Sequence, residues 1–167
     1  NPFTMDNDLG LVRLATPADR DLLVRCREDF FAAEGWELDA DELEGFRSQW
    51  RTYIDAHLGR DFLAALVVGP QGDVRSLAFL VLTERPASPR APSGWQGTVV
   101  NVLSYVQYRR RGYARRAVAA LIEQARSRGV SRLELSASVD GEQLYRGLGF
   151  TESATDGFLP MALRLVD

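Results

Sequence analysis

The residues best suited to chemistry lie in one run, 109–114, which reads Arg-Arg-Arg-Gly-Tyr-Ala and falls between an expected strand and an expected helix. A helix N-terminus exposes about four backbone N–H groups and carries a partial positive charge. A turn with glycine lets main-chain donors approach a pyrophosphate there, and arginines add fork-shaped charged donors. Gly112 and Ala114 keep this turn free of bulk. The run therefore predicts a phosphate-binding loop.

Two other interpretations of the run are a solvated basic face and a weak nucleic-acid patch over residues 109–116. A nucleic-acid patch predicts an affinity that falls steeply with salt, and the net charge of −3 argues against it. A dinucleotide loop is disfavoured because the run is not Gly-x-Gly-x-x-Gly and comes late in the chain. Since all 20 basic residues are arginine, a Walker lysine and a Schiff-base lysine are excluded.

The composition bounds the class of protein. A chain of 167 residues with 46% apolar and 26% charged residues is typical of one globular domain, which we expect over residues 5–167, with residues 1–4 outside the fold. Cys26 has no cysteine partner, and with His57 as the one histidine no metal site is expected. Without an apolar run of about 18 residues we expect a cytoplasmic protein that does not bind membranes.

Hydrophobic periodicity then predicts the elements that position the run. Helices are expected at 18–34, 41–58, 114–128 and 141–148, and strands at 11–14, 62–68, 75–83, 97–106, 133–137, 150–153 and 159–166. Residues 86–94, with three prolines, are expected to form an exposed loop. The order β-α-α-β-β-β-α-β-α-β-β indicates an α+β domain, with a mixed twisted sheet flanked by helices and a right-handed parallel crossover near its C-terminal half.

A family resemblance rests on two stretches. Residues 101–112, which end in the Arg-Arg-Arg-Gly turn, and Tyr145 followed by Gly-Leu-Gly-Phe at 147–150 resemble the GNAT superfamily of N-acetyltransferases. The resemblance covers residues 97–152, and the N-terminal part agrees in element order. It implies the GNAT-like acyl-CoA N-acyltransferase fold, acetyl-CoA as co-substrate, and direct transfer of the acetyl group to a primary amine. Because members often dimerise, a homodimer is one expected assembly.

The resemblance also implies roles for individual residues. Tyr145 would be the general acid, since a phenol of pKa about 10 can protonate a departing thiolate whose thiol has a pKa of about 8.5. The co-substrate would contact Leu103, Ser104, Tyr105, Arg109, Arg111, Gly112, Tyr113, Ala114, Arg115 and Ser138. The chain departs from the family pattern at Val106, where proline is usual, and at Ser138, where asparagine is usual. The alternative to a catalytic role is that Tyr145 is a core residue of its helix.

Neither the general base nor the acceptor is identified by the sequence. Carboxylates at Glu28, Asp29, Glu34 and Glu84 and the imidazole of His57 are candidates for the base, and a water chain or deprotonation in solution would also serve. The alternative is a solvated surface charge for each carboxylate and a charge that complements the helix dipole for His57.

The stretch 28–44 is acidic and aromatic, which suits a cationic amine with an apolar part; two amphipathic helices with core aromatics explain it equally well. A small-molecule acceptor is preferred over a peptide N-terminus or a protein lysine. The alternative from another functional class is a domain that binds an acyl-CoA as a sensor and catalyses no reaction.

Overall fold

The computed structural model describes residues 10–153 and 157–167. They form two compact units, divided after Ser136. The first unit holds a sheet and three longer helices, and the second holds one short helix, α4 (Glu142–Gly147). Residues 1–4, expected to stand apart from the fold, lie outside the described residues.

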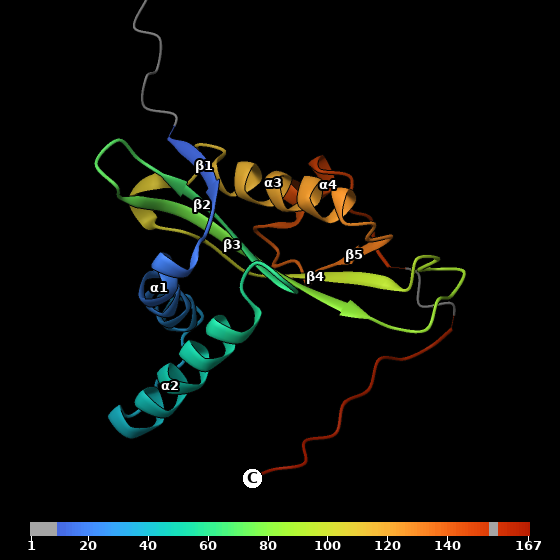
Figure 1. The fold of residues 1–167 in the computed structure, drawn as a ribbon, viewed down its shortest axis with the longest axis horizontal. Coiled ribbons are helices and arrows are strands. Elements are labelled where there is room, and N and C mark those ends of the chain that lie inside the picture. Colours follow the sequence, from blue (N-terminus) through green and yellow to red (C-terminus); the bar gives the residue numbers. More distant parts are fainter. Residues whose placement is uncertain (1–9, 154–156) are drawn as a thin grey trace, which may run out of the picture. The chain divides into compact units, whose positions relative to one another are not determined.

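One five-stranded sheet organises the first unit (Figure 1). Its strands, in spatial order, are β1 (Leu11–Leu14), β2 (Phe62–Val68), β3 (Val74–Glu84), β4 (Trp95–Ser104) and β5 (Arg132–Glu134). The first three pairings are antiparallel, and β4 pairs with β5 in parallel. The predicted mixed sheet is therefore confirmed, with β4, an intervening helix and β5 as its parallel crossover.

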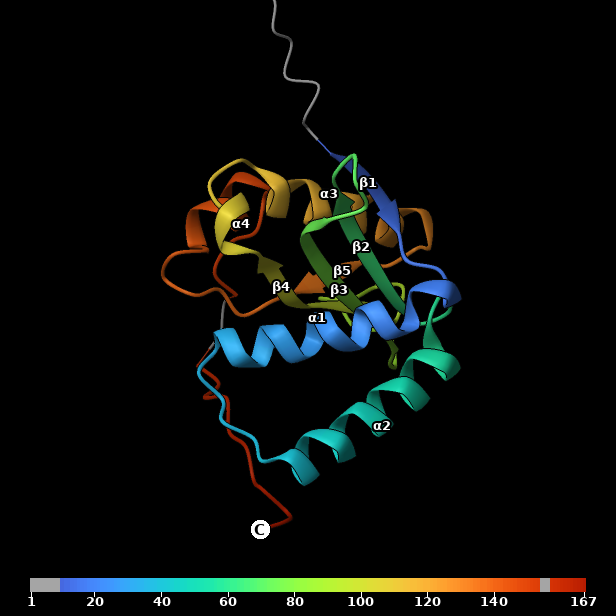
Figure 2. The ribbon, with the colours of Figure 1, turned by 90° about the vertical axis from the view of Figure 1, so that its left-hand side faces the viewer.

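Helices cover both faces of this sheet (Figure 2). On one face lie α1 (Arg20–Ala33) and α2 (Ala40–His57), and on the other lies α3 (Tyr113–Ser127). The start of α2 is fixed by Asp39, whose side chain accepts from two first-turn N–H groups. Strands β2 and β3 are buried along almost their whole length. Because helices cover both faces of the sheet, apolar side chains are favoured on both faces of these two strands.

Strand β4 changes its pairing part-way along its length. It pairs with β5 only through residues 96–98, although it pairs with β3 as far as Ser104. A register shift opposite β3 marks a bulge at Asn101, whose φ of 54° is a left-handed conformation that asparagine tolerates. Among the described residues, the edge of β4 beyond Thr98 that would face β5 therefore has no strand partner.

The structure corrects the C-terminal part of the prediction. Strand β5 ends at Glu134 instead of residue 137, and neither 150–153 nor 159–166 forms a strand. In the latter segment Leu159, Met161, Leu163 and Leu165 alternate with polar or small residues but are 80–87% exposed. Alternation gives a strand two different faces, but a strand also needs a neighbour for its N–H and C=O groups, which the described residues do not supply here. The strand expected to run to residue 106 ends at Ser104, and Val106–Tyr108 forms a 3-10 turn.

Gly97 allows the close packing of β4 on β5. A Cβ atom at Gly97 would lie 2.6 Å from Cδ2 of Leu133 and 2.9 Å from Cδ1 of Leu80. We expect Gly97→Ala to lower the free energy of unfolding by about 1–3 kcal/mol in urea denaturation, because these methyl groups must shift. Gly45→Ala is the control: its Cβ would meet nothing within 4 Å in α2, so it should stabilise the protein by about 0.5–1 kcal/mol. A Gly97→Ala protein as stable as the parent would contradict this packing.

Candidate active site

The end of β4 is held rigidly from the side of β3. The hydroxyl of Ser76 donates to the carbonyl of Leu103 at 2.9 Å and shares a hydrogen bond with the hydroxyl of Ser104 at 2.9 Å. The N–H of Tyr105 donates to the carbonyl of Arg75 at 3.1 Å. Residues 103–105 therefore have a fixed main chain at the place where the opposite edge of β4 pairs with no other strand in the part of the chain that the structure describes.

The glycine turn follows directly. Gly112 is the N-cap of α3 with a φ of 79°, and a Cβ atom there would meet nothing within 4 Å. Left-handed backbone favours glycine, and a residue without a side chain offers no cap to the first-turn N–H groups, which lack partners within a helix. The turn and the helix N-terminus thus have the backbone shape that the sequence predicts for a phosphate-binding loop.

An anchor that the sequence did not reveal holds this loop. The Arg75 side chain is buried, with its guanidinium carbon 5.1 Å from the ring centroid of Tyr108 and 5.5 Å from that of Tyr113. It donates to the hydroxyl of Tyr113 at 2.8 Å and to the carboxylate of Asp73 at 3.1 Å. Asp73 also accepts from the hydroxyl of Tyr108 at 2.9 Å. The β2–β3 hairpin and the loop before α3 are joined by charge-assisted hydrogen bonds.

The arginines of the run have different roles. Arg109 donates through Nε to the carbonyl of Ser104 at 3.2 Å and so ties the loop to β4. Arg111 and Arg115 are exposed at the start of α3. Arg116 donates to the carbonyl of Gly10 at 2.9 Å, ahead of β1. The run is therefore partly structural, and exposed guanidinium groups remain close to the glycine turn.

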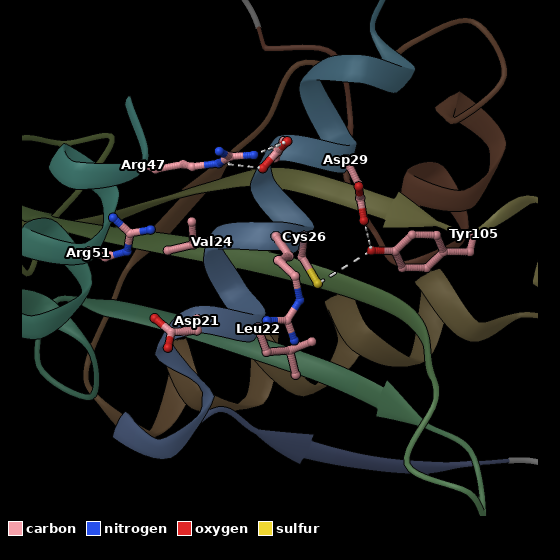
Figure 3. A pocket seen from close by; sticks show the side chains of 10 residues that line it. Asp21, Leu22, Val24, Cys26, Asp29, Arg47, Arg51 and Tyr105 are labelled. Carbon is pink, nitrogen blue, oxygen red and sulfur yellow. Dashed lines mark hydrogen bonds and ion pairs between the residues drawn. The ribbon is translucent and has the colours of Figure 1, made fainter. Parts of the chain in front are cut away.

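A cavity of about 550 Å³ lies between α1, α2 and Tyr105 (Figure 3). The Tyr105 hydroxyl donates to Oδ2 of Asp29 at 2.6 Å and lies 3.6 Å from Sγ of Cys26. Burial, and then the hydrogen bond to Asp29, raises the pKa of Tyr105 well above its usual value. Burial likewise raises the pKa of the Cys26 thiol. Tyr105 and Cys26 are therefore both protonated at neutral pH.

The structure distinguishes the candidates for the general base by their positions and partners. Asp29 and Glu28 both line the cavity, but Glu28 forms an ion pair with Arg47 at 2.7 Å. Glu34 and Glu84 are exposed and do not line it. At the end of α2, His57 shares a hydrogen bond with Asp61 at 2.7 Å. Of the five candidates, Asp29 alone combines a place in the cavity with a hydrogen bond to the end of β4.

The aromatic residues of 28–44 largely join α1 to α2. Phe31 stacks on Trp50 with ring centroids 5.9 Å apart, and Phe30 packs edge-on against Phe31. The guanidinium carbon of Arg27 lies 4.8 Å from the Phe31 centroid. These contacts favour the interpretation of the aromatic stretch as an interhelical core, whereas Trp36 is exposed.

Ser138 and Tyr145 belong to the second unit and are described within it. The Ser138 hydroxyl accepts from the N–H of Gly141 at 3.1 Å, and its carbonyl accepts from the N–H of Glu142, so the residue initiates the turn into α4. The Tyr145 ring packs edge-on against Phe150 at 6.1 Å, and burial raises the pKa of its phenol. The roles of Ser138 and Tyr145 stay predictions.

Comparisons with known proteins agree with this fold. Residues 31–150 match the model of the acetyltransferase (GNAT) family. Similar structures include a predicted acetyltransferase with acetyl-CoA from Clostridium acetobutylicum (22% identity, 91% of this chain and 95% of that one, TM-score 0.77). A second is a GCN5-related N-acetyltransferase from Ralstonia eutropha JMP134 (20% identity, 92% of this chain and 97% of that one, TM-score 0.72). A third is glucosamine-6-phosphate N-acetyltransferase from Arabidopsis thaliana (14% identity, 93% of this chain and 98% of that one, TM-score 0.64). A comparison with curated protein sequences gives no match.

Among the described residues, a strand edge without a partner lies next to a glycine turn and a helix N-terminus, an arrangement that suits a phosphate-bearing ligand. With the family model covering most of its length, the chain belongs to the acetyltransferase (GNAT) family. Family membership indicates acetyl transfer with acetyl-CoA as co-substrate. In the described ranges, no group of three or more His, Cys, Asp or Glu side chains could hold a metal ion. No helix there is long and apolar enough to cross a membrane.

The loop anchor makes a prediction about pH. The hydrogen bond from Tyr108, and then that from Arg75, lowers the pKa of Asp73 from its ordinary value. Its carboxylate therefore stabilises the folded state above the unfolded pKa of about 3.9, and this contribution is lost as the pH falls through the lower folded pKa. We expect Asp73→Asn to be less stable than the parent at pH 7, with the difference vanishing near about pH 2 in urea denaturation. A difference that does not change with pH would contradict the anchor.

Proposed function

We propose that the protein is an acetyl-CoA-dependent N-acetyltransferase that acts on the primary amine of a small molecule. The observation that carries this proposal is that the edge of β4, which has no strand partner within residues 10–153 and 157–167, is followed by the glycine turn at the N-terminus of α3. A flexible thioester arm needs main-chain partners, and a diphosphate needs N–H donors. This part of the chain offers both within about a dozen residues, 103–115.

The residues present fit this co-substrate. Gly112 leaves open space in front of α3, and the buried Nδ2 of Asn101, at the bulge of β4, has no partner among the described residues. Such a donor favours a bound molecule with an acceptor oxygen. In this proposal the pantetheine arm contacts Leu103, Ser104, Tyr105 and Ser138, and the diphosphate contacts Arg109, Arg111, Gly112, Tyr113, Ala114 and Arg115.

The proposed reaction is direct. The neutral amine nitrogen attacks the thioester carbon and forms the C–N bond, while backbone N–H groups stabilise the oxyanion. The C–S bond then breaks, the thiolate takes the phenolic proton of Tyr145, and the excess proton of the new amide nitrogen passes to solvent, from which the phenolate is reprotonated. The phenol of Tyr145 is protonated at neutral pH, as a proton donor must be, while burial raises its pKa and so makes it a weaker acid.

The cavity between α1 and α2 supports a small acceptor. Its volume of about 550 Å³ lies within the range of sites for small molecules. A peptide N-acetyltransferase and a non-catalytic acyl-CoA sensor are the alternatives. Release of thiol from acetyl-CoA in the presence of small amines, measured against peptides, separates the three, because a sensor releases none.

The general acid is tested by Tyr145→Phe. We expect kcat to fall by about 100-fold or more, since the leaving thiolate loses its proton donor, while the Kd for CoA stays the same. Tyr53→Phe is the control: Tyr53 packs between His57 and Phe62 in the core, so kcat should be unaffected. An unchanged kcat in Tyr145→Phe would remove the proposed role.

The loop is tested by Gly112→Glu. A carboxylate at the turn repels the diphosphate, so we expect calorimetry to detect no CoA binding. The control is Gly129→Glu at the other end of α3, where the glycine also has a positive φ, of 74°, and equally open surroundings. It incurs a similar backbone strain and should keep CoA affinity. CoA binding by Gly112→Glu at the parent's affinity would place the diphosphate elsewhere.

A further inference from the structure

Two opposite charges in the α1–α2 cavity form no ion pair with any residue that the structure describes. The charged residues that line it are Asp21, Arg25, Glu28, Asp29, Arg47 and Arg51. Glu28 pairs with Arg47 inside the cavity, and Asp21 and Arg51 pair with residues outside it. Within the described residues, Arg25 and Asp29 take part in no ion pair. An exposed guanidinium and an exposed carboxylate thus remain at the cavity without an ion pair among the described residues.

These two groups lie one helical turn apart on α1, on either side of Cys26 in the sequence. Burial is the main cause of the raised pKa of the Cys26 thiol, but the charge of Asp29 raises it further and that of Arg25 lowers it, so both charges act on one sulfur. An arginine and a carboxylate at this spacing commonly pair. Here Asp29 instead accepts from Tyr105, and its carboxylate faces the end of β4 (Figure 3).

We propose that the acceptor is a small amino acid, a molecule that carries an amine and a carboxylate. This inference rests on the proposed function and names its substrate class. The reacting amine is held by the carboxylate of Asp29, and the substrate carboxylate is bound by the guanidinium of Arg25, whose forked donors match it. Leu22 and Val24 supply apolar lining for the remainder of the substrate.

Tyr105 connects this site to the transfer step. Its main chain belongs to the stretch proposed to contact the thioester, and its hydroxyl orients Asp29 from 2.6 Å. In this proposal the Tyr105 side chain links the amine held by Asp29 to the segment that the thioester contacts. Because the raised pKa of Tyr105 keeps its hydroxyl protonated, it remains a donor to Asp29 throughout the neutral range. Tyr105 is a positioning residue in this scheme.

The experiment compares matched substrates. Apolar α-amino acids, and ω-amino acids of two to six carbons, are assayed with acetyl-CoA beside their own carboxamides, which keep the amine and lose the charge. We expect kcat/KM for the best acid to exceed that of its carboxamide by about tenfold or more, as one charge-assisted contact implies. Arg25→Gln should bring this ratio close to one, because it should lower kcat/KM for the acid and leave kcat/KM for the carboxamide unchanged. Asp29→Asn should lower kcat/KM for both.

Controls and outcomes separate this inference from the proposed function. Glu123→Gln and Arg126→Gln break an exposed ion pair on α3 and should leave the acid-to-carboxamide ratio unchanged. A parent ratio near one for all pairs, or a ratio that survives Arg25→Gln, overturns the amino-acid site while amine turnover still supports an N-acetyltransferase. If no amine turns over, the proposed function fails. Calorimetry of the same amino acids on the CoA-loaded protein then decides the site: binding lost in Arg25→Gln supports it, and no binding overturns it.

Discussion

The candidate active site depends on the point at which β4 stops pairing with β5. The two strands share a ladder only at residues 96–98, yet β3 continues to hold β4 as far as Ser104. A strand supported on one side keeps a fixed main chain while its other edge lacks a strand partner. The chain then turns through Gly112 straight into α3. A rigid main-chain edge and a helix N-terminus, the two partners that a thioester with a diphosphate tail requires, therefore follow one another in sequence and in space.

The other elements support this arrangement. The β2–β3 hairpin contributes Asp73 and Arg75, which hold the loop through Tyr108 and Tyr113. On the opposite face, α1 and α2 enclose the cavity, and the Tyr105 side chain joins it to the end of β4. Both connections fasten a segment of 103–113 to a distant element. The site is thereby positioned from both faces of the sheet.

Local patterns in the sequence predicted most of this fold. The continuous apolar run at 62–68 became β2 within its predicted bounds, and glycines ended helices where the periodicity stopped. The glycine turn was predictable because its chemistry is contained in six consecutive residues. The Arg75–Tyr113 and Tyr105–Asp29 contacts were not, since they join residues 38 and 76 positions apart that share no local pattern. The strand expected at 159–166 failed because alternation identifies the two faces of a strand but not its neighbour.

A crystal structure with acetyl-CoA provides the decisive observation. We expect the diphosphate oxygens to accept from backbone N–H groups of residues 112–115 and the pantetheine arm to run along β4 beyond Thr98. A complex in which the nucleotide lies elsewhere, with the Gly112 turn facing only solvent, would contradict this expectation.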